Sequence, residues 1–126
     1  MKVLVAEDDL ASGKFMQKLL SKYGEVVLAR DGIAAVDEFV NAVSTNERFD
    51  LICMDIMMPK LDGIAATKAI RAMERPDAVE IPIIAMTANA FEEDARKCVE
   101  AGMNAHLSKP LQMDVVVGTI AQYYKR

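Results

Sequence analysis

The fold of this chain is decided by residues 51–63, which read LICMDIMMPKLDG. The apolar run over 51–54 predicts a buried strand, and a charged residue, Asp55, follows it directly. The pair Asp62-Gly63 then indicates a turn. A carboxylate costs several kcal/mol to bury alone, so Asp55 needs cationic neighbours or an open, hydrated site. Ligands bind at the carboxyl ends of the strands in open α/β sheets, which makes Asp55 the first candidate for chemistry.

Strand and helix patterns alternate five times along the chain. We predict strands over 2–7, 25–29, 49–54, 81–86 and 104–108, and helices over 10–22, 32–45, 62–75, 90–101 and 111–125. Helix N-caps are predicted at Asp9, Asp31, Asp62 and Asn89, and helix ends near Gly24 and Gly102. Residues 75–78 form the clearest loop. This alternation, with strands that are almost continuously apolar, predicts an α/β fold whose parallel sheet carries helices on both faces.

The composition limits the classes of function. The 126 residues fit a single domain over 1–126, and 52% hydrophobic residues are enough for a core without disulfides or a structural metal. A net charge of −4 argues against direct nucleic-acid binding. We expect no membrane insertion, because the sequence has neither a secretory signal pattern nor an apolar stretch of about 18 residues. Cys53 and Cys98 form no metal-spaced set, which favours reduced thiols in a cytoplasmic protein.

Polar residues close four of the predicted strands. Glu7-Asp8 closes the first, Asp55 the third, Thr87 the fourth and Lys109 the fifth. Parallel strands bring these ends to one edge of the sheet. Clustered carboxylates repel each other unless a hard cation lies among them, and oxygen ligands suit Mg²⁺. A carboxylate beside Mg²⁺ can accept a phosphoryl group as a nucleophile and form an aspartyl phosphate.

Each of these residues also has an ordinary structural interpretation. Asp9, next to the acidic pair, is better explained as a helix cap than as a metal ligand. Thr87 alone is unremarkable in a strand, and Lys109 alone would be a surface lysine. The prediction of a phosphoacceptor site therefore depends on the joint placement at four strand ends.

This pattern resembles the CheY-like receiver domain of two-component response regulators, over essentially the whole chain. The resemblance is carried by VLVAED (3–8), MDIMMPKLDG (54–63), IIAMTA (83–88), AGMN (101–104) and SKP (108–110). It implies a single three-layer, doubly wound (βα)5 parallel sheet of the flavodoxin type, with strand order 2-1-3-4-5. The stretch MTANAF at 86–91 is most similar to receivers fused to hybrid histidine kinases. We therefore expect this receiver to be part of such a longer protein rather than free-standing.

The resemblance also implies roles for the residues at the strand ends. Asp55 would be the phosphoacceptor, supplied by a phosphohistidine on a histidine kinase or a histidine phosphotransfer protein. Asp8 would be a direct Mg²⁺ ligand and Glu7 would act largely through water, with the backbone carbonyl of Met57 as a further ligand. Thr87 would supply the switch hydroxyl.

The remaining site roles implied by the resemblance fall at and around the end of the fifth strand. Lys109 would supply the ammonium that binds phosphate. The Lys109–Pro110 peptide bond is expected to be cis. Phosphorylation would shift the surface formed by helix 90–101, strand 104–108 and helix 111–125. The same surface is a candidate for weak dimer formation.

Two features depart from the family pattern or adjust it. His106 stands where the family usually has Tyr or Phe, and we interpret it as a substitute for that ring with a weaker or altered switch. A pH-sensitive role for its imidazole is the less favoured alternative. Met57 and Asn89 occupy the positions that tune the lifetime of the phosphoryl group. Because Met57 is apolar and could limit access of water, we predict that Met57→Asn changes the rate of dephosphorylation.

Two other functions remain to be weighed. Phosphatases of the haloacid dehalogenase type also form an aspartyl phosphate, but they carry a second Asp two residues after the nucleophile, where this chain has Met57. A pseudo-receiver that only binds partners would not need intact Asp8, Asp55, Thr87 and Lys109. The sequence therefore favours a signalling domain that catalyses only its own phosphorylation and dephosphorylation, rather than a turnover enzyme.

Overall fold

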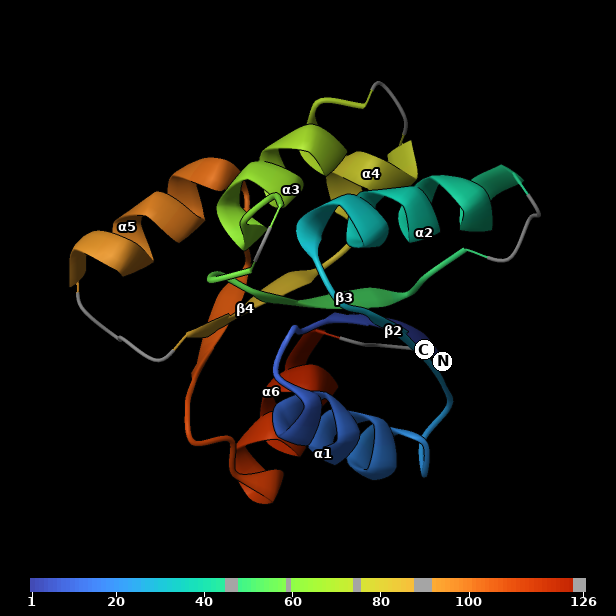
Figure 1. Ribbon diagram of the computed structural model, residues 1–126, viewed down its shortest axis with the longest axis vertical. Helices are drawn as coiled ribbons and strands as arrows, with labels where there is room; N and C mark the ends of the chain where they lie inside the picture. The colour runs from blue at the N-terminus through green and yellow to red at the C-terminus, as the bar shows by residue number, and fades with distance from the viewer. Residues whose placement is uncertain (45–47, 59, 74–75, 88–91, 124–126) are drawn as a thin grey trace.

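The protein is a three-layer α/β structure built on a five-stranded parallel sheet (Figure 1). The computed structural model describes residues 1–44, 48–58, 60–73, 76–87 and 92–123. The strands are β1 (Lys2–Ala6), β2 (Glu25–Ala29), β3 (Leu51–Asp55), β4 (Ile83–Thr87) and β5 (Ala105–Ser108). The helices are α1 (Leu10–Leu20), α2 (Gly32–Ser44), α3 (Gly63–Arg71), α4 (Pro76–Glu80), α5 (Glu92–Ala101) and α6 (Met113–Tyr123). The strand order β2-β1-β3-β4-β5 is the order that the family resemblance implies.

Helices cover both faces of the sheet, as the sequence predicts. Figure 1 shows α2, α3, α4 and α5 on one face and α1 with α6 on the other. Alternate residues of each strand point to opposite faces, so the core divides into two clusters. Phe39, Ile52 and Ile70 belong to the cluster under α2 and α3, and Met16 and Ile120 to the one under α1 and α6. Every residue of β3 and β4 is buried, which explains why these strands read as continuous apolar runs.

Side-chain caps begin three helices where the sequence predicts them. Asp9 accepts a hydrogen bond from the Ser12 amide at 3.0 Å, Asp31 from the Ala34 amide at 2.8 Å and Asp62 from the Ala65 amide at 2.7 Å. Each of these bonds satisfies an amide that the first helical turn leaves without a partner. Gly102 ends α5 with a φ of 107°, a conformation that favours glycine. The predicted cap at Asn89 lies outside the described residues.

The sequence prediction was wrong about the segment between β3 and β4. It placed one helix over 62–75 and a loop over 75–78, whereas α3 ends at Arg71 and a short helix, α4, begins at Pro76. Proline fits the first position of a helix, because its fixed φ suits the helix and the missing amide would have no partner there. The strand predicted over 49–54 is instead β3 at Leu51–Asp55. Asp50 lies just before it and bonds Lys2 twice, through its amide to the Lys2 carbonyl and through Oδ2 from the Lys2 amide, each at 2.8 Å.

Two predictions drawn from composition can be compared with the structure. Cys53 and Cys98 are buried thiols in β3 and α5. Burial raises the pKa of Cys53 to about 12, so its thiol stays protonated. Among the residues that the structure describes, no helix is long and apolar enough to cross a membrane.

Candidate functional site

The predicted site residues meet at the carboxyl edge of the sheet. Glu7 and Asp8 follow β1, and Asp55 is the last residue of the neighbouring strand β3. Glu7 is held there by a backbone hydrogen bond of 2.9 Å from its amide to the Ala29 carbonyl at the end of β2. The three side chains each offer a carboxylate oxygen within 4.8 Å of the others. Glu7 and Asp55 are buried and Asp8 is exposed, so the cluster opens to solvent on one side.

Lys109 neutralises part of this negative charge. Its Nζ lies 2.5 Å from Glu7 Oε1 and 3.1 Å from Asp55 Oδ2, although more than fifty residues of sequence separate it from either partner. Burial alone would lower the pKa of Lys109, but the hydrogen bonds and charges of the two carboxylates outweigh it and raise that pKa. Lys109 therefore stays charged and bridges the ends of β1, β3 and β5.

Glu7 is the least satisfied member of the cluster. Its side chain is buried, and Oε2 has no hydrogen-bond partner within the described ranges. Burial, reinforced by the neighbouring Asp55 and opposed by Lys109, raises the pKa of Glu7 to about 7 from its usual 4.5. A buried carboxylate oxygen with no donor is a strained arrangement that a cation or a proton would relieve. Three oxygen donors, one of them orphaned, fit a hard divalent cation such as Mg²⁺.

Asp55 is held at the bottom of the site by the backbone around it. The Met57 amide donates to Asp55 Oδ1 at 3.2 Å, so one carboxylate oxygen faces Met57 and the other faces Lys109. The Ile56 amide donates to the Met86 carbonyl at 3.1 Å and extends the pairing of β3 with β4. The Met57 side chain is 76% exposed, so it lies at the rim of the site and not in the core.

Thr87 and Lys109 are neighbours through the backbone. Thr87 is buried at the end of β4, and its carbonyl accepts a hydrogen bond of 2.8 Å from the Lys109 amide. The Lys109–Pro110 peptide bond is cis, as expected from the resemblance. The hydroxyl and the ammonium predicted for phosphate binding therefore come from adjoining strand ends.

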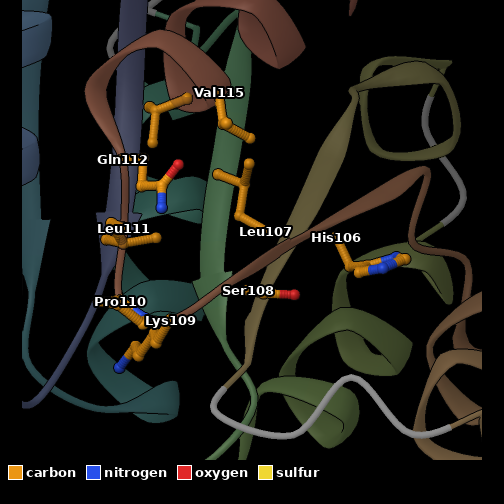
Figure 2. Close-up of a pocket in the computed structure, with 9 residues that line it drawn as sticks. His106, Leu107, Ser108, Lys109, Pro110, Leu111, Gln112 and Val115 are labelled. Atoms are coloured by element: carbon orange, nitrogen blue, oxygen red, sulfur yellow. The ribbon is translucent and has the colours of Figure 1, made fainter.

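A pocket of about 300 Å³ runs from β5 to the start of α6 beside Lys109 (Figure 2). His106 lies at one end of it, exposed on β5, and Figure 2 shows its ring pointing away from Lys109. His106 thus occupies an outward position on the edge strand. Leu111 and Val115 line the opposite end of the pocket.

The structure brings together most of the predicted residues and separates a few. Asp9 is a cap, exposed to solvent, and hydrogen bonds from the side chain and amide of Ser12 lower its pKa. Asn89 lies outside the described part of the chain. Sequence reasoning treated Asp31 only as a cap and gave no role to Lys60, yet the Lys60 Nζ lies 3.5 Å from Asp31 Oδ2 beside the Asp55 loop. The one local signal was the turn-type pair Asp31-Gly32, which is separated from the end of β2 by Arg30.

The comparisons with known proteins agree on one family. The profile of the response regulator receiver domain matches residues 3–121. The chain is 38% identical to the probable histidine kinase 2 of Oryza sativa subsp. indica over 130 residues, covering 95% of this chain and 12% of that protein. The chain therefore spans only about an eighth of that relative's length.

Two solved structures share the fold closely. The receiver domain of the sensor histidine kinase PA1611 from Pseudomonas aeruginosa, with a magnesium ion coordinated in its active-site cleft, has a TM-score of 0.83 and 35% identity, over 97% of this chain and 95% of that one. A chain from the Saccharomyces cerevisiae complex of the histidine phosphotransfer protein Ypd1 with the receiver domain of Ssk1 has a TM-score of 0.84 and 28% identity. This match covers 98% of this chain and 88% of that one.

Proposed function

This chain belongs to the family of response regulator receiver domains, and on that premise we propose that Asp55 accepts a phosphoryl group from a phosphohistidine of a partner protein. The observation that carries the proposal is the contact of one ammonium, Lys109, with both Glu7 and Asp55 inside a cluster of three carboxylates. Such an arrangement places a nucleophile next to a positive charge and next to oxygen donors for a cation. Phosphoryl transfer needs these elements and little else.

The acidic cluster would hold Mg²⁺. Asp8 and Asp55 would bind the ion, with Glu7 acting largely through water and the Met57 carbonyl as a further ligand. The orphaned Glu7 Oε2 and the exposure of Asp8 to solvent support this assignment. When bound, Mg²⁺ would neutralise charge on the phosphoryl oxygens and on the carboxylates.

The transfer step uses residues already in place. A carboxylate oxygen of Asp55 attacks phosphorus, the P–N bond to the partner's histidine breaks, and that imidazole takes up a proton. Lys109, which now pairs with Asp55 Oδ2, would then pair with the negatively charged oxygens of the new phosphoryl group. The Thr87 hydroxyl would bond a phosphoryl oxygen, which is how the site would report phosphorylation to the rest of the domain.

The same geometry disfavours the two rival functions. A phosphatase of the haloacid dehalogenase type needs a second acid two residues after its nucleophile, and Met57 stands there with an exposed, apolar side chain. A pseudo-receiver would not need the paired Lys109, Glu7 and Asp55. The domain would therefore catalyse its own phosphorylation and dephosphorylation and turn over no separate substrate.

The partner would be a histidine kinase or a histidine phosphotransfer protein. The similarity to the Ypd1–Ssk1 complex and to a rice histidine kinase supports that choice. A cytoplasmic domain without direct nucleic-acid contacts fits the net charge of −4. Phosphorylation would act on the face of α5, β5 and α6, where Val99 is 71% and Val115 is 49% exposed. That face would contact an output partner or form a weak dimer.

The test is phosphorylation by a small phosphodonor. With Mg²⁺ and acetyl phosphate we expect the mass to rise by one phosphoryl group in the wild type and in Asp37→Ala, an exposed acidic residue of α2, but not in Asp55→Ala. Continuous release of inorganic phosphate would instead support the phosphatase. An unmodified wild type would overturn the proposal in favour of the pseudo-receiver.

A further inference from the structure

The loop that follows Asp55 is held at both of its ends. The described residues 56–58 and 60–62 lie between β3 and α3, and the Gly63 amide donates a 2.9 Å bond back to the Ile56 carbonyl. Gly63 also lies directly against Asp55, because a Cβ at Gly63 would be 2.0 Å from the Asp55 carbonyl oxygen. Within this loop the Met57 amide donates to Asp55 Oδ1. The position of the backbone at Met57 therefore helps to orient Asp55, together with Lys109 on the other carboxylate oxygen.

The end of the loop nearest α3 rests on the start of α2 through Leu61. A Cβ at Gly32 would lie 1.9 Å from the Leu61 carbonyl oxygen and 2.7 Å from its carbon. Only a residue without a side chain allows this backbone contact, and the atoms in contact cannot move aside as a flexible side chain would. Gly32 is the first residue of α2, which the pairing of β1 with β2 places beside the site.

An ion pair adds a second contact next to the first. Asp31 Oδ1 caps α2 through the Ala34 amide, which leaves Oδ2 directed to Lys60 Nζ at 3.5 Å. Lys60 has a φ of 68°, a left-handed conformation that a side chain rarely adopts and that the surrounding structure must maintain. The ion pair with Asp31 and the contact of the next residue, Leu61, with Gly32 supply that support.

We propose that Asp31 and Gly32 are positioning residues for the phosphoacceptor. Through Lys60 and Leu61 they hold residues 60–62, and the bond of the following Gly63 amide to Ile56 passes that placement to the Met57 backbone, which faces Asp55. Neither Asp31 nor Gly32 contacts Asp55 itself in the described structure. The end of β2 would thus set the geometry of a site whose chemistry comes from β1, β3 and β5. This inference rests on the proposed function, because it assigns a role in the same reaction.

The first test replaces Gly32 with alanine, against the matched control Gly118→Ala. Gly118 lies in α6 and has open space where a Cβ would go, so its replacement should change nothing at the site. Gly32→Ala must push the Leu61 carbonyl away. We expect the amide resonance of Met57 in the metal-free protein to shift and the acetyl phosphate reaction to slow about tenfold, since small misplacements near a reacting group have large effects on rate.

A second set of variants covers the case in which Gly32→Ala does not fold. Asp31→Asn keeps an oxygen for the α2 cap but removes the charge, and Lys60→Met removes the other half of the pair. Each should shift the Met57 amide and slow phosphorylation about twofold, because Lys60 is largely exposed. The double variant should be no slower than either single one.

The outcomes separate this inference from the proposed function. If the wild type is not phosphorylated, the proposed function fails. If the wild type is phosphorylated but both sets leave the rate and the Met57 resonance unchanged, the positioning role is wrong while the function stands. A Gly32→Ala variant that loses stability in urea but keeps both readouts would also overturn the positioning role.

Discussion

The two edges of the sheet each hold a half-buried cation, but they surround it in opposite ways. At the carboxyl edge, Lys109 meets two carboxylates and one of their oxygens has no partner. At the amino edge, Arg71 at the end of α3 donates to neutral oxygens in every bond that the described residues make with it. Its bonds of 2.8–3.0 Å go to the carbonyls of Ala78, Val79 and Gly102 and to Asn104 Oδ1.

The difference is one of hydrogen-bond satisfaction. A guanidinium has five N–H donors, and Arg71 makes five bonds, which join α3 to α4 and to the segment before β5. Asn104 Oδ1 also accepts from the Ile83 amide at 2.9 Å, so β4 joins the same network. Among the described residues, all five N–H donors of Arg71 are used, whereas the Lys109 cluster has one acceptor, Glu7 Oε2, without a partner. A saturated polar cluster maintains structure, and an unsaturated one is available for a ligand.

The largest expected effect is at the amino edge. Arg71→Met removes the guanidinium donors from two partly buried carbonyls, those of Ala78 and Gly102, and breaks the junction of α3 with α4 and with the segment before β5, and we expect it to lower the free energy of unfolding by about 3 kcal/mol. Urea denaturation measures this loss, with Arg96→Met, an exposed arginine of α5, as the control. The fraction that remains folded should still be phosphorylated at the wild-type rate. A loss equal to that of Arg96→Met would show that the cluster is not a structural junction.

Lys109→Met should differ from Arg71→Met in kind, because we expect it to lower the rate of phosphorylation more than the free energy of unfolding. Without the Lys109 ammonium, the negative charge on the phosphoryl oxygens loses its neighbouring positive charge during transfer. We therefore expect phosphorylation by acetyl phosphate to slow about 100-fold. The rate is measured by intact mass against time, with Lys68→Met, an exposed lysine of α3, as the control. If the Lys109 variant reacts as fast as the control, Lys109 has only a structural role like that of Arg71.

The raised pKa of Glu7 predicts a dependence of stability on pH that the Arg71 cluster lacks. The unfolded chain loses the Glu7 proton near its usual pKa of 4.5, and the folded chain loses it near 7. Between these values the folded protein holds a proton that the unfolded one does not, so its stability falls as pH rises. The expected loss in metal-free protein is about 2 kcal/mol from about pH 5 to about pH 7.

Urea denaturation across this pH range checks the prediction. Glu7→Gln should remove most of the slope, while Glu38→Gln, at an exposed position of α2, should keep it. Equal slopes in the wild type and in Glu7→Gln would mean that Glu7 is not the group that titrates.

The smallest effect is expected at the rim of the site. Met57 is largely exposed beside Asp55, and replacing its apolar side chain with Asn should admit and orient water more readily. We expect Met57→Asn to shorten the half-life of the aspartyl phosphate about threefold, a change worth less than 1 kcal/mol. The half-life is measured in magnesium buffer after removal of the phosphodonor, with Met113→Asn as the control. An unchanged half-life would show that the Met57 side chain does not affect the lifetime of the phosphoryl group.

Residues whose roles depend on local pattern were predicted well from the sequence. The caps at Asp9, Asp31 and Asp62 follow from a polar residue before an amphipathic stretch, and the strand ends follow from where apolar runs stop. The short helix at Pro76–Glu80 was missed because proline is both a loop signal and a good first helical residue. Local pattern does not choose between those two.

Contacts between segments that are distant in the chain could not be predicted from the sequence. Arg71 looks like an ordinary basic residue in the last turn of a helix, yet its partners Gly102 and Asn104 lie about thirty positions away. Lys60 and Asp31 are separated in the same way. His106 was expected to replace an inward-swinging ring, and only the structure places it at an exposed position of the edge strand.

The sequence by itself determined the alternation of five strands with helices, apart from the short helix α4, and the candidates for the reacting groups. Both depend on short-range physics: the period of apolar residues, helix caps, and the cost of placing Asp55 after a buried run. The tertiary structure alone decided which residues are in contact. Lys109 bridges Glu7 and Asp55, and Glu7 Oε2 has no hydrogen-bond partner among the described residues. Gly32 lies against the backbone of Leu61. These depend on distances of a few ångströms between segments far apart in the chain, which arise only when the sheet and its helices pack together.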